Sequence, residues 1–460
     1  MNLLHKLSII FTLTTLCTSN TYAINYTDAA FACSDKHKWQ EAMSAAKKSG
    51  DPVVLKIIKS MKFLDSNCNE NSFEEITQFL NQNPKWPQRQ KMIIAAENLL
   101  SSSSNKNKII EWFSKNPSIT DNGAQYYALA AAEKETDPAT LTHAIKEGWI
   151  YGDYNPSEQK EYLSKYKKYL SHLDHVKKID YLLWHHKEQK AQSLMHLVDK
   201  SHQSMFKTAI ALIQNKSGAE SLFLNLPEEN KYNSIVLYSY LKRYEKQDID
   251  SHLGGLIAKA HSDSDHANQW WMLKSRFARD LMKQKKYNEA YNITSNHHAA
   301  SSEDISNAEF LSGFLALRYL DKPEQAKKHF LAMHKIVKMP ISIAKASYWI
   351  ARCDLAIGNE ADAHKHLREA AAFNYTFYGQ LAALELGNKS INLPSRPKIN
   401  DTHKHNVNKN ELARASKILL AHGKDMMALL YAKDALAHTS CPAEALLLVD
   451  YMRKTNKPRY

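Results

Sequence analysis

The feature that most constrains the fold is an alanine that recurs at nearly constant spacing in successive helical segments. Ala290, Ala326 and Ala363 each lie in the second of two consecutive amphipathic segments, at spacings of 36 residues (290 to 326) and 37 residues (326 to 363), and Ala428 follows 65 residues later (363 to 428). A period of about 34 residues is typical of tetratricopeptide units, which are pairs of antiparallel helices. Because each pair buries its apolar face only against neighbouring pairs, the spacing predicts a superhelix or ring of stacked helical hairpins, a tetratricopeptide-like α-solenoid.

The composition agrees with an all-α fold. The 460 residues include only 12 glycines and 13 prolines, too few turn formers for a large sheet protein. Apolar residues recur at helical spacing along most of the chain, as at Trp270, Leu273, Phe277 and Leu281, whereas long alternating patterns typical of strands are absent.

The stretch from Ile341 to Gly387 predicts three consecutive helices, with a break at Gly358 and Asn359 between the first two. Small residues at regular positions would let these helices approach closely, and they are Ala346, Ala351, Ala363, Ala370 and Ala382. Larger residues are expected to fill the space between the helices, and they are Tyr348, Trp349, Leu367 and Phe377.

The N-terminal residues 1–23 are predicted to be a secretory signal peptide. Lys6 precedes the apolar run Leu7 to Leu16, and Thr21, Tyr22 and Ala23 provide a site for signal peptidase. The run is too short to span a bilayer, and no stop-transfer segment follows it. Lipid attachment at Cys17 is the less favoured alternative, because the large residue Leu16 precedes it. The sequence therefore predicts an exported protein without a transmembrane segment.

Four cysteines remain after removal of the signal peptide: Cys33, Cys68, Cys353 and Cys441. Cys33 and Cys68 are the best candidates for a disulfide, because they are closest in sequence and lie where the helical pattern is weakest. Cys353, inside a predicted helix, is expected to be a buried thiol. No CxxC spacing occurs, so a zinc or redox motif is not predicted.

Histidine is abundant, with 22 residues, but its spacing does not predict a metal site. The adjacent pairs are His185 with His186 and His297 with His298, and the alternating pairs are His364 with His366 and His403 with His405. Neighbouring histidines on a helix point in different directions, and no acidic residue at a matching offset completes a ligand set. The motif HExxH is absent, so these histidines are expected at the surface, and no metal or cofactor is predicted.

Several sequence runs resemble the superhelical region of the soluble lytic murein transglycosylases, periplasmic enzymes that cleave the glycan strands of peptidoglycan. The most specific runs are YWIAR at Tyr348 to Arg352, the GNEADA turn that follows, and TFYGQLA at Thr376 to Ala382. Further similar runs lie earlier in the chain, at 145–154, 174–184, 269–281 and 308–330. The resemblance implies a superhelical domain over residues 24–387 and helices over 411–460 like the start of the family's linker domain. Residues 388–410 between them are polar and lack periodicity, which predicts a linker.

The residues that would cleave glycan are not found in this chain. The family's catalytic Glu stands in a Glu-Ser pair, followed about ten residues later by a GLMQ-type run, and it must be shielded so that its raised pKa keeps it protonated. The pair Glu220 and Ser221 is followed by LFLNLPEENKYN, which has no glycine and no such run. No catalytic residue is therefore predicted, and Glu220 is expected to be an ordinary residue near a helix start.

Two hypotheses of function remain. The first is a wall-associated scaffold that binds peptidoglycan or cell-wall enzymes. The second is one part of a divided or truncated transglycosylase whose catalytic domain lies elsewhere or was lost. The net charge of +13, or +12 without Lys6, favours an acidic partner such as peptidoglycan, and no compact basic run in an exported chain suggests nucleic acid.

Tryptophans and arginines are the remaining candidates for binding. The tryptophans are expected mainly in the core rather than stacked on sugars, and they are Trp149, Trp184, Trp270, Trp271 and Trp349. The arginines either bind stem-peptide carboxylates or satisfy helix C-termini, and they are Arg276, Arg279, Arg318 and Arg352.

Overall fold

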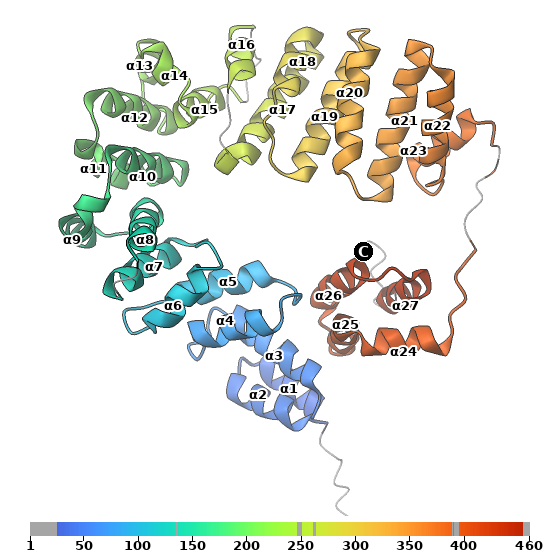
Figure 1. Cartoon of the computed structure of the whole chain (residues 1–460), viewed down its shortest axis with the longest axis horizontal. Coiled ribbons are helices and arrows are strands. Elements are labelled where there is room, and N and C mark those ends of the chain that lie inside the picture. The colour runs from blue at the N-terminus through green and yellow to red at the C-terminus, as the bar shows by residue number, and fades with distance from the viewer. Residues whose placement is uncertain are drawn as a thin grey trace, which may run out of the picture. The chain divides into compact units, whose positions relative to one another are not determined.

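The computed structural model of this chain describes residues 25–134, 137–245, 251–260, 264–388, 390 and 395–453. Within these ranges the fold is all-α, and no strand is present (Figure 1). The predicted signal peptide lies outside the described residues. No helix in the described part of the chain combines the length and the apolar character needed to cross a membrane. The chain forms two compact units: unit 1 comprises residues 1–123 and 397–460, and unit 2 comprises residues 124–396.

Unit 1 is built from two segments that are far apart in sequence. The N-terminal segment contributes α1 (Tyr26–Ser34), α2 (Trp39–Lys48), α3 (Pro52–Leu64), α4 (Phe73–Gln82), α5 (Arg89–Asn98) and α6 (Lys106–Phe113). The C-terminal segment contributes α24 (Asp401–Lys409), α25 (Glu411–Ala421), α26 (Asp425–Ala437) and α27 (Pro442–Arg453). Helix α7 (Asp121–Glu133) begins in unit 1 and continues into unit 2.

The predicted linker, residues 388–410, contains a helix. Asn400 caps α24 by accepting a hydrogen bond from the backbone N–H of His403 at 3.0 Å. The polar composition that suggested a linker suits this helix, because only Val407 of its residues is buried. Residues after 400 belong to the same compact unit as the N-terminal helices.

Apolar and charged contacts join the two segments of unit 1. Helix α25 lies beside α3 (Figure 1), and Tyr431 of α26 is buried against Trp86, with ring centroids 5.3 Å apart. The hydroxyl group of Tyr431 also lies 3.2 Å from the hydroxyl of Ser60 in α3. Around this contact, ion pairs join Asp51 to Arg414 at 2.6 Å, Lys56 to Glu411 at 2.5 Å, Asp28 to His422 at 3.0 Å, and Asp35 to Lys424. Both segments are therefore needed for the core of unit 1.

Unit 2 is a run of helices that follow one another in sequence. Its first part comprises α8 (Pro138–Tyr151), α9 (Pro156–Tyr166), α10 (His172–Trp184), α11 (Glu188–Ser193), α12 (Lys200–Ile213), α13 (Ala219–Leu224), α14 (Glu228–Lys231), α15 (Ser234–Lys242) and α16 (Ser251–Lys259), with short 3-10 turns at Lys167–Tyr169, Met195–Leu197 and Ser264–His266. Its second part comprises α17 (Ala267–Lys283), α18 (Tyr287–Ser295), α19 (Ser302–Arg318), α20 (Pro323–Ile336), α21 (Pro340–Ile357), α22 (Glu360–Ala371) and α23 (Phe377–Glu385).

From α17 to α23, each helix packs against the next, and Figure 1 shows α17 to α22 as a row of antiparallel helices. The predicted alanine register is confirmed, because Ala290 on α18, Ala326 on α20 and Ala363 on α22 are all fully buried, and so is Ala428 on α26. Gly313 on α19 serves the same purpose, since a Cβ atom there would lie 2.8 Å from the ring of Phe330. Small side chains therefore set the spacing between neighbouring hairpins.

The predicted helix break lies at Gly358. This residue ends α21 with a φ angle of +86°, which favours glycine, and the N–H of Asn359 then donates to the carbonyl of Asp354 at 2.8 Å. The small residues predicted at helix contacts in 341–387 are all fully buried. Tyr348 and Leu367 are buried as expected. The prediction for Phe377 is wrong, because its side chain, on the first residue of α23, is 65% exposed.

The predicted disulfide between Cys33 and Cys68 is also wrong, since all four cysteines in the described residues are free. The segment between the two cysteines is helical, and the Asp65 carboxylate links its parts by hydrogen bonds. Asp65, between α3 and α4, accepts hydrogen bonds from Trp39 Nε1 at 2.7 Å and from His37 Nδ1 at 2.8 Å. Cys353 is a buried thiol as predicted, and burial raises its pKa to about 12.

A first prediction tests the alanine register. Ala363→Trp should lower the free energy of unfolding by about 1 to 3 kcal/mol, because the indole must displace neighbouring helices. Chemical denaturation followed by circular dichroism would measure this loss. The matched control is Ala361→Trp on the exposed side of the same helix, where little change is expected. Equal stabilities of the two variants would mean that the register is misplaced.

Candidate functional site

A groove of about 450 Å³ opens between α19, α21 and α23, and it is lined mainly by aromatic side chains and arginines. Its lining comprises Leu317 and Arg318 of α19, Tyr348, Trp349, Arg352 and Ala356 of α21, and Phe377, Tyr378 and Leu381 of α23. This volume lies within the range of ligand-binding pockets, about 300 to 1,000 Å³. The two runs YWIAR and FYGQLA supply most of the lining, and we call this surface the aromatic groove.

The two arginines of the aromatic groove differ in their partners. Arg352 Nη1 lies 2.9 Å from Glu385 Oε1, which also accepts a hydrogen bond from the Tyr348 hydroxyl at 2.7 Å. Burial and the Glu385 carboxylate together raise the pKa of Tyr348, so its phenol stays a neutral donor. Arg318 is exposed at the end of α19 and makes no ion pair within the described residues. It is therefore the cation that a ligand carboxylate could engage.

Trp349 contributes part of its indole ring to the lining of the aromatic groove. Its half-buried indole packs among Phe310, Phe314 and Phe330, with ring centroids 5.4 to 6.0 Å apart. Its Nε1–H is buried and has no hydrogen-bond partner among the described residues. A buried donor without a partner costs about 1 to 3 kcal/mol, so this N–H weakens the packing around α21.

A second groove, of about 470 Å³, lies between α10, α12, α15 and α17. Like the aromatic groove, this second groove is lined by aromatic and basic side chains. Trp184 and Tyr238 have ring centroids 4.9 Å apart. Lys242 and Arg243 add positive charge. The Nε1–H of Trp184 is also buried without a partner among the described residues. The cations here are already engaged, however, since Lys242 pairs with Glu245 at 2.8 Å and Arg243 bonds to Asn215.

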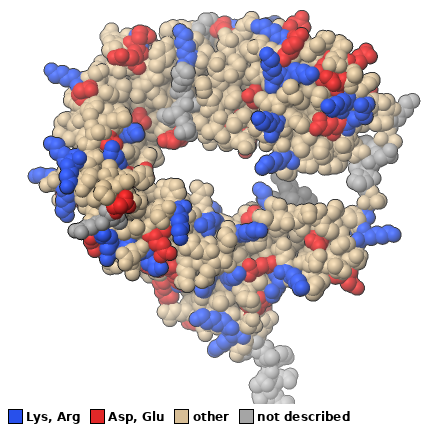
Figure 2. Space-filling model, viewed as in Figure 1, with Lys and Arg blue, Asp and Glu red and all other residues tan. Residues whose placement is uncertain are grey.

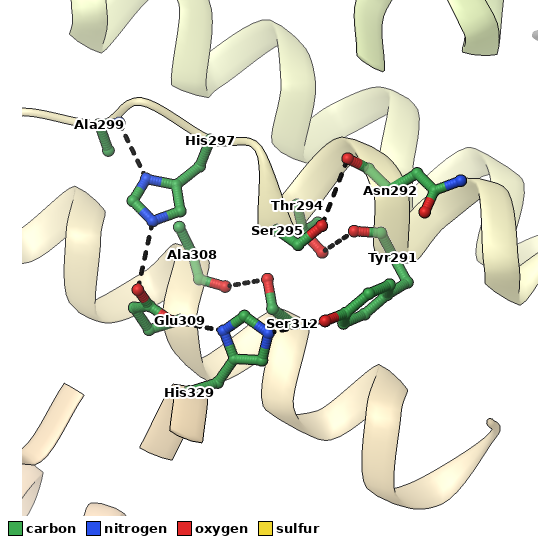
Figure 3. Close-up of polar contacts among 10 residues, drawn as sticks. All are labelled: Tyr291, Asn292, Thr294, Ser295, His297, Ala299, Ala308, Glu309, Ser312 and His329. Atoms are coloured by element: carbon green, nitrogen blue, oxygen red, sulfur yellow. Dashed lines mark hydrogen bonds and ion pairs between the residues drawn. The ribbon is translucent and has the colours of Figure 1, made fainter. Parts of the chain in front are cut away.

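Glu309 is the centre of a polar cluster that joins α18, α19 and α20 (Figure 3). Its Oε2 lies 2.6 Å from His329 Nδ1, and its Oε1 lies 3.5 Å from His297 Nε2. His329 Nε2 in turn lies 2.9 Å from the hydroxyl of Tyr291, and the backbone N–H of Ala299 donates to His297 Nδ1 at 2.9 Å. Both histidines are thus satisfied while each presents an N–H to the carboxylate.

Burial alone would raise the pKa of Glu309, but the hydrogen bonds and charge of His297 and His329 outweigh it and lower the pKa from 4.5 to about 2. The order carboxylate, imidazole, hydroxyl resembles a hydrolytic triad. Its hydroxyl belongs to the buried Tyr291, however, whose pKa is raised by burial and by Glu309, so it is a poor nucleophile. The cluster therefore stabilises helix packing.

The Glu-Ser pair of the sequence lies on the surface. Glu220 is exposed in the first turn of α13, and its Oε1 accepts a hydrogen bond from the Tyr244 hydroxyl at 2.8 Å. Among the described carboxylates with a shifted pKa, Glu97 is the one whose pKa is raised. Burial raises the pKa of Glu97, and hydrogen bonds from Thr120 and Ile119 partly oppose this effect. Glu97 is fully buried and caps the segment before α7, and a Cβ atom at Gly123 would overlap its carboxylate. Substrate cannot reach Glu97.

The structure separates the aromatic and basic candidates of the sequence. Trp149, Trp270 and Trp271 are core residues as predicted, whereas Trp184 and Trp349 are half-buried and line the two grooves. Arg279 donates to the carbonyl of Ser275, and Arg276 pairs with Glu245 at 3.5 Å. Only Arg318 and Arg352 therefore line the aromatic groove. Tyr378 and Leu381 were missed as lining residues, although the FYGQLA run that contains them was recognised.

Two of the histidines expected at the surface are instead partly buried and paired. His297 contacts Glu309, and His366 Nδ1 lies 2.9 Å from Asp354 Oδ2. Asp354 is fully buried and also pairs with Lys327 at 2.5 Å, which joins α20, α21 and α22. Each histidine is 12 residues from its acidic partner in sequence. Residues on one face of a helix are three or four positions apart, so helical spacing does not predict these two pairs.

Comparison with known proteins gives structural neighbours only, since no family profile and no curated protein matches this sequence. The X-ray structure of an inactive mutant of the lytic transglycosylase Slt from Pseudomonas aeruginosa aligns over 94% of this chain and 71% of its own chain, with 15% sequence identity and a TM-score of 0.51. The 70-kDa soluble lytic transglycosylase from Escherichia coli aligns over the same shares, with 14% identity and a TM-score of 0.48. The likeness to the Pseudomonas protein shows a shared helical fold.

Proposed function

We propose that this chain is an exported, peptidoglycan-associated helical protein that holds wall material or a wall enzyme without cleaving glycan itself. The observation that carries the proposal is the aromatic groove, where the exposed Arg318 lies in the same lining as the aromatic rings of Phe377 and Tyr378. A sugar ring can pack against an aromatic face such as that of Phe377, while an arginine binds a carboxylate of a stem peptide. The likeness in fold to a lytic transglycosylase supports the choice of polymer.

Charge supports the same proposal. The chain carries +12 without its predicted signal peptide, and peptidoglycan stem peptides carry carboxylates. On the face shown in Figure 2, basic and acidic side chains are interspersed rather than gathered in one patch. General attraction to an anionic polymer would therefore be weak, and the aromatic groove would supply the specific contact.

The test is co-sedimentation of the purified chain with isolated sacculi at increasing salt. We expect binding at low salt that weakens as ions screen the charges. Arg318→Ala should weaken binding about tenfold, which corresponds to about 1.4 kcal/mol. Phe377→Ala removes an exposed aromatic face of the groove and should weaken binding without changing its salt dependence.

Arg368→Ala is the matched control, because Arg368 is also exposed in unit 2 but lies outside the aromatic groove. It should leave binding almost unchanged. If both arginine variants bind equally weakly, then the attraction is general and the groove is not the site. Absence of co-sedimentation at low salt would remove the wall-binding proposal.

A second candidate function is one part of a divided lytic transglycosylase. It is favoured by the likeness in fold to the Pseudomonas transglycosylase, of which the alignment covers 71%. The co-sedimentation experiment also separates the scaffold from the enzyme part, if the supernatant is assayed for muropeptides released from the sacculi. The chain alone should release none, whereas release by the chain alone would mean that it carries a catalytic acid of its own.

A further inference from the structure

Three side chains that can bind metal meet at the N-terminal ends of α10 and α12. His172 is the first residue of α10, Asp199 caps the N-terminus of α12, and His202 follows in the first turn of α12. The Oδ2 atom of Asp199 lies 2.9 Å from His202 Nδ1 and 3.3 Å from His172 Nε2. One ligand atom from each residue lies within 4.8 Å of the other two.

Local structure holds these groups in place. Asp199 Oδ1 accepts the backbone N–H of His202 at 2.9 Å, which is the usual helix cap and fixes the carboxylate. The backbone N–H of Asp199 lies 3.2 Å from His172 Nε2, and the two imidazole rings meet edge to face with centroids 5.0 Å apart. The carboxylate is therefore oriented by the cap toward two imidazoles from different helices.

The spacing of the three groups suits a small divalent transition metal. Zinc binds imidazole nitrogen and carboxylate oxygen at about 2.0 to 2.2 Å in a tetrahedral arrangement, so neighbouring ligand atoms lie about 3.4 Å apart. The observed distances of 2.9 and 3.3 Å are close to this value. All three side chains are partly exposed, so the site is accessible and water can complete the coordination.

We propose that His172, Asp199 and His202 form a binding site for zinc or a similar divalent transition metal, with two imidazoles and one carboxylate as protein ligands. At His202 the metal takes the place of the hydrogen shared with the Asp199 carboxylate, and that hydrogen leaves to solvent as a proton when the histidine was charged. At His172 the metal takes the Nε2 lone pair that now accepts the backbone N–H of Asp199. Because its ligands come from α10 and α12, a bound metal links these helices. The site is independent of the aromatic groove and of the proposed wall association.

Zinc titration of the purified chain, without its predicted signal peptide and without a histidine tag, tests this site. We expect one equivalent of zinc to bind more tightly than the rest in competition with a chromogenic chelator. Asp199→Asn keeps a good helix cap but removes the charged ligand, and it should weaken this equivalent at least tenfold. His202→Ala should weaken it at least as much.

His364→Ala is the matched control, because His364 is exposed on α22 and lies outside the cluster. It should bind the tight equivalent like the wild type. Cobalt should give the intense visible absorption of a tetrahedral site in the wild type and in His364→Ala, but not in Asp199→Asn. If all variants titrate alike, then zinc binds to scattered surface histidines and the proposal is wrong.

Discussion

Tyr431→Ala is expected to lower the free energy of unfolding of unit 1 by about 3 to 5 kcal/mol, the usual cost of removing a large buried aromatic side chain. Tyr431 is fully buried, its ring meets Trp86 edge to face, and its hydroxyl contacts Ser60. Burial also raises the pKa of Tyr431 to about 12, so its phenol stays neutral there. The truncation would leave a cavity between the two segments of unit 1.

Hydrogen exchange is the suitable measurement, because a chain with two compact units need not unfold in one step. Exchange should accelerate in α3, α25 and α26, while the helices from α17 to α22 keep their protection. Tyr431→Phe is the control: it keeps the ring, loses the hydroxyl and its contact with Ser60, and should cost about 0.5 to 1.5 kcal/mol. Unchanged protection of α3 in Tyr431→Ala would contradict the proposed role of this contact.

Glu309→Gln is expected to destabilise unit 2 by about 3 kcal/mol at neutral pH. The pKa of Glu309 falls from 4.5 to about 2 on folding, and each unit of pKa corresponds to about 1.4 kcal/mol. A lowered pKa stabilises the folded state above pH 4.5, and this stabilisation is lost as the pH falls toward 2. The stability difference between wild type and variant should therefore narrow below about pH 4.5.

Chemical denaturation of both proteins over this pH range would measure the difference. Glu303→Gln is the control, because Glu303 is exposed in the first turn of the same helix, where its charge contributes about 1 kcal/mol at most. Tyr291→Phe should cost less than Glu309→Gln, since it removes only the outer hydroxyl of the cluster. A difference between wild type and Glu309→Gln that stays constant with pH would mean that the carboxylate contributes no such linkage.

Much of the fold could be predicted from the sequence, because stacked hairpins depend on local patterns. The buried alanines at 290, 326 and 363 and the break at Gly358 follow from helical periodicity and from the left-handed conformation that glycine adopts. The division into two units could not be predicted in this way. It depends on contacts such as that between Ser60 and Tyr431, which are 371 residues apart and leave no periodic signal.

The candidate sites were predictable only in part. The runs that line the aromatic groove were recognised, but the sequence could not tell that Trp349 keeps an unpaired donor or that Phe377 is exposed. The pairing of His329 with Glu309 and the meeting of His172 with Asp199 each join different helices. Side-chain contacts of this kind depend on how helices pack, and residue spacing does not record them.

The docking of α25 and α26 against the N-terminal helices affects the order in which the two units fold. In unit 2, each helix finds its partner in the adjoining residues, so pairing needs only short loops to close. Asp28 and His422 are 394 residues apart, and the entropy lost in closing so long a loop is recovered only when α25 and α26 dock. Until then, the side of α3 that packs against α25 and holds Ser60 stays uncovered. We therefore expect completion of unit 1 to be the slow step, and the one during which the chain is most prone to aggregate.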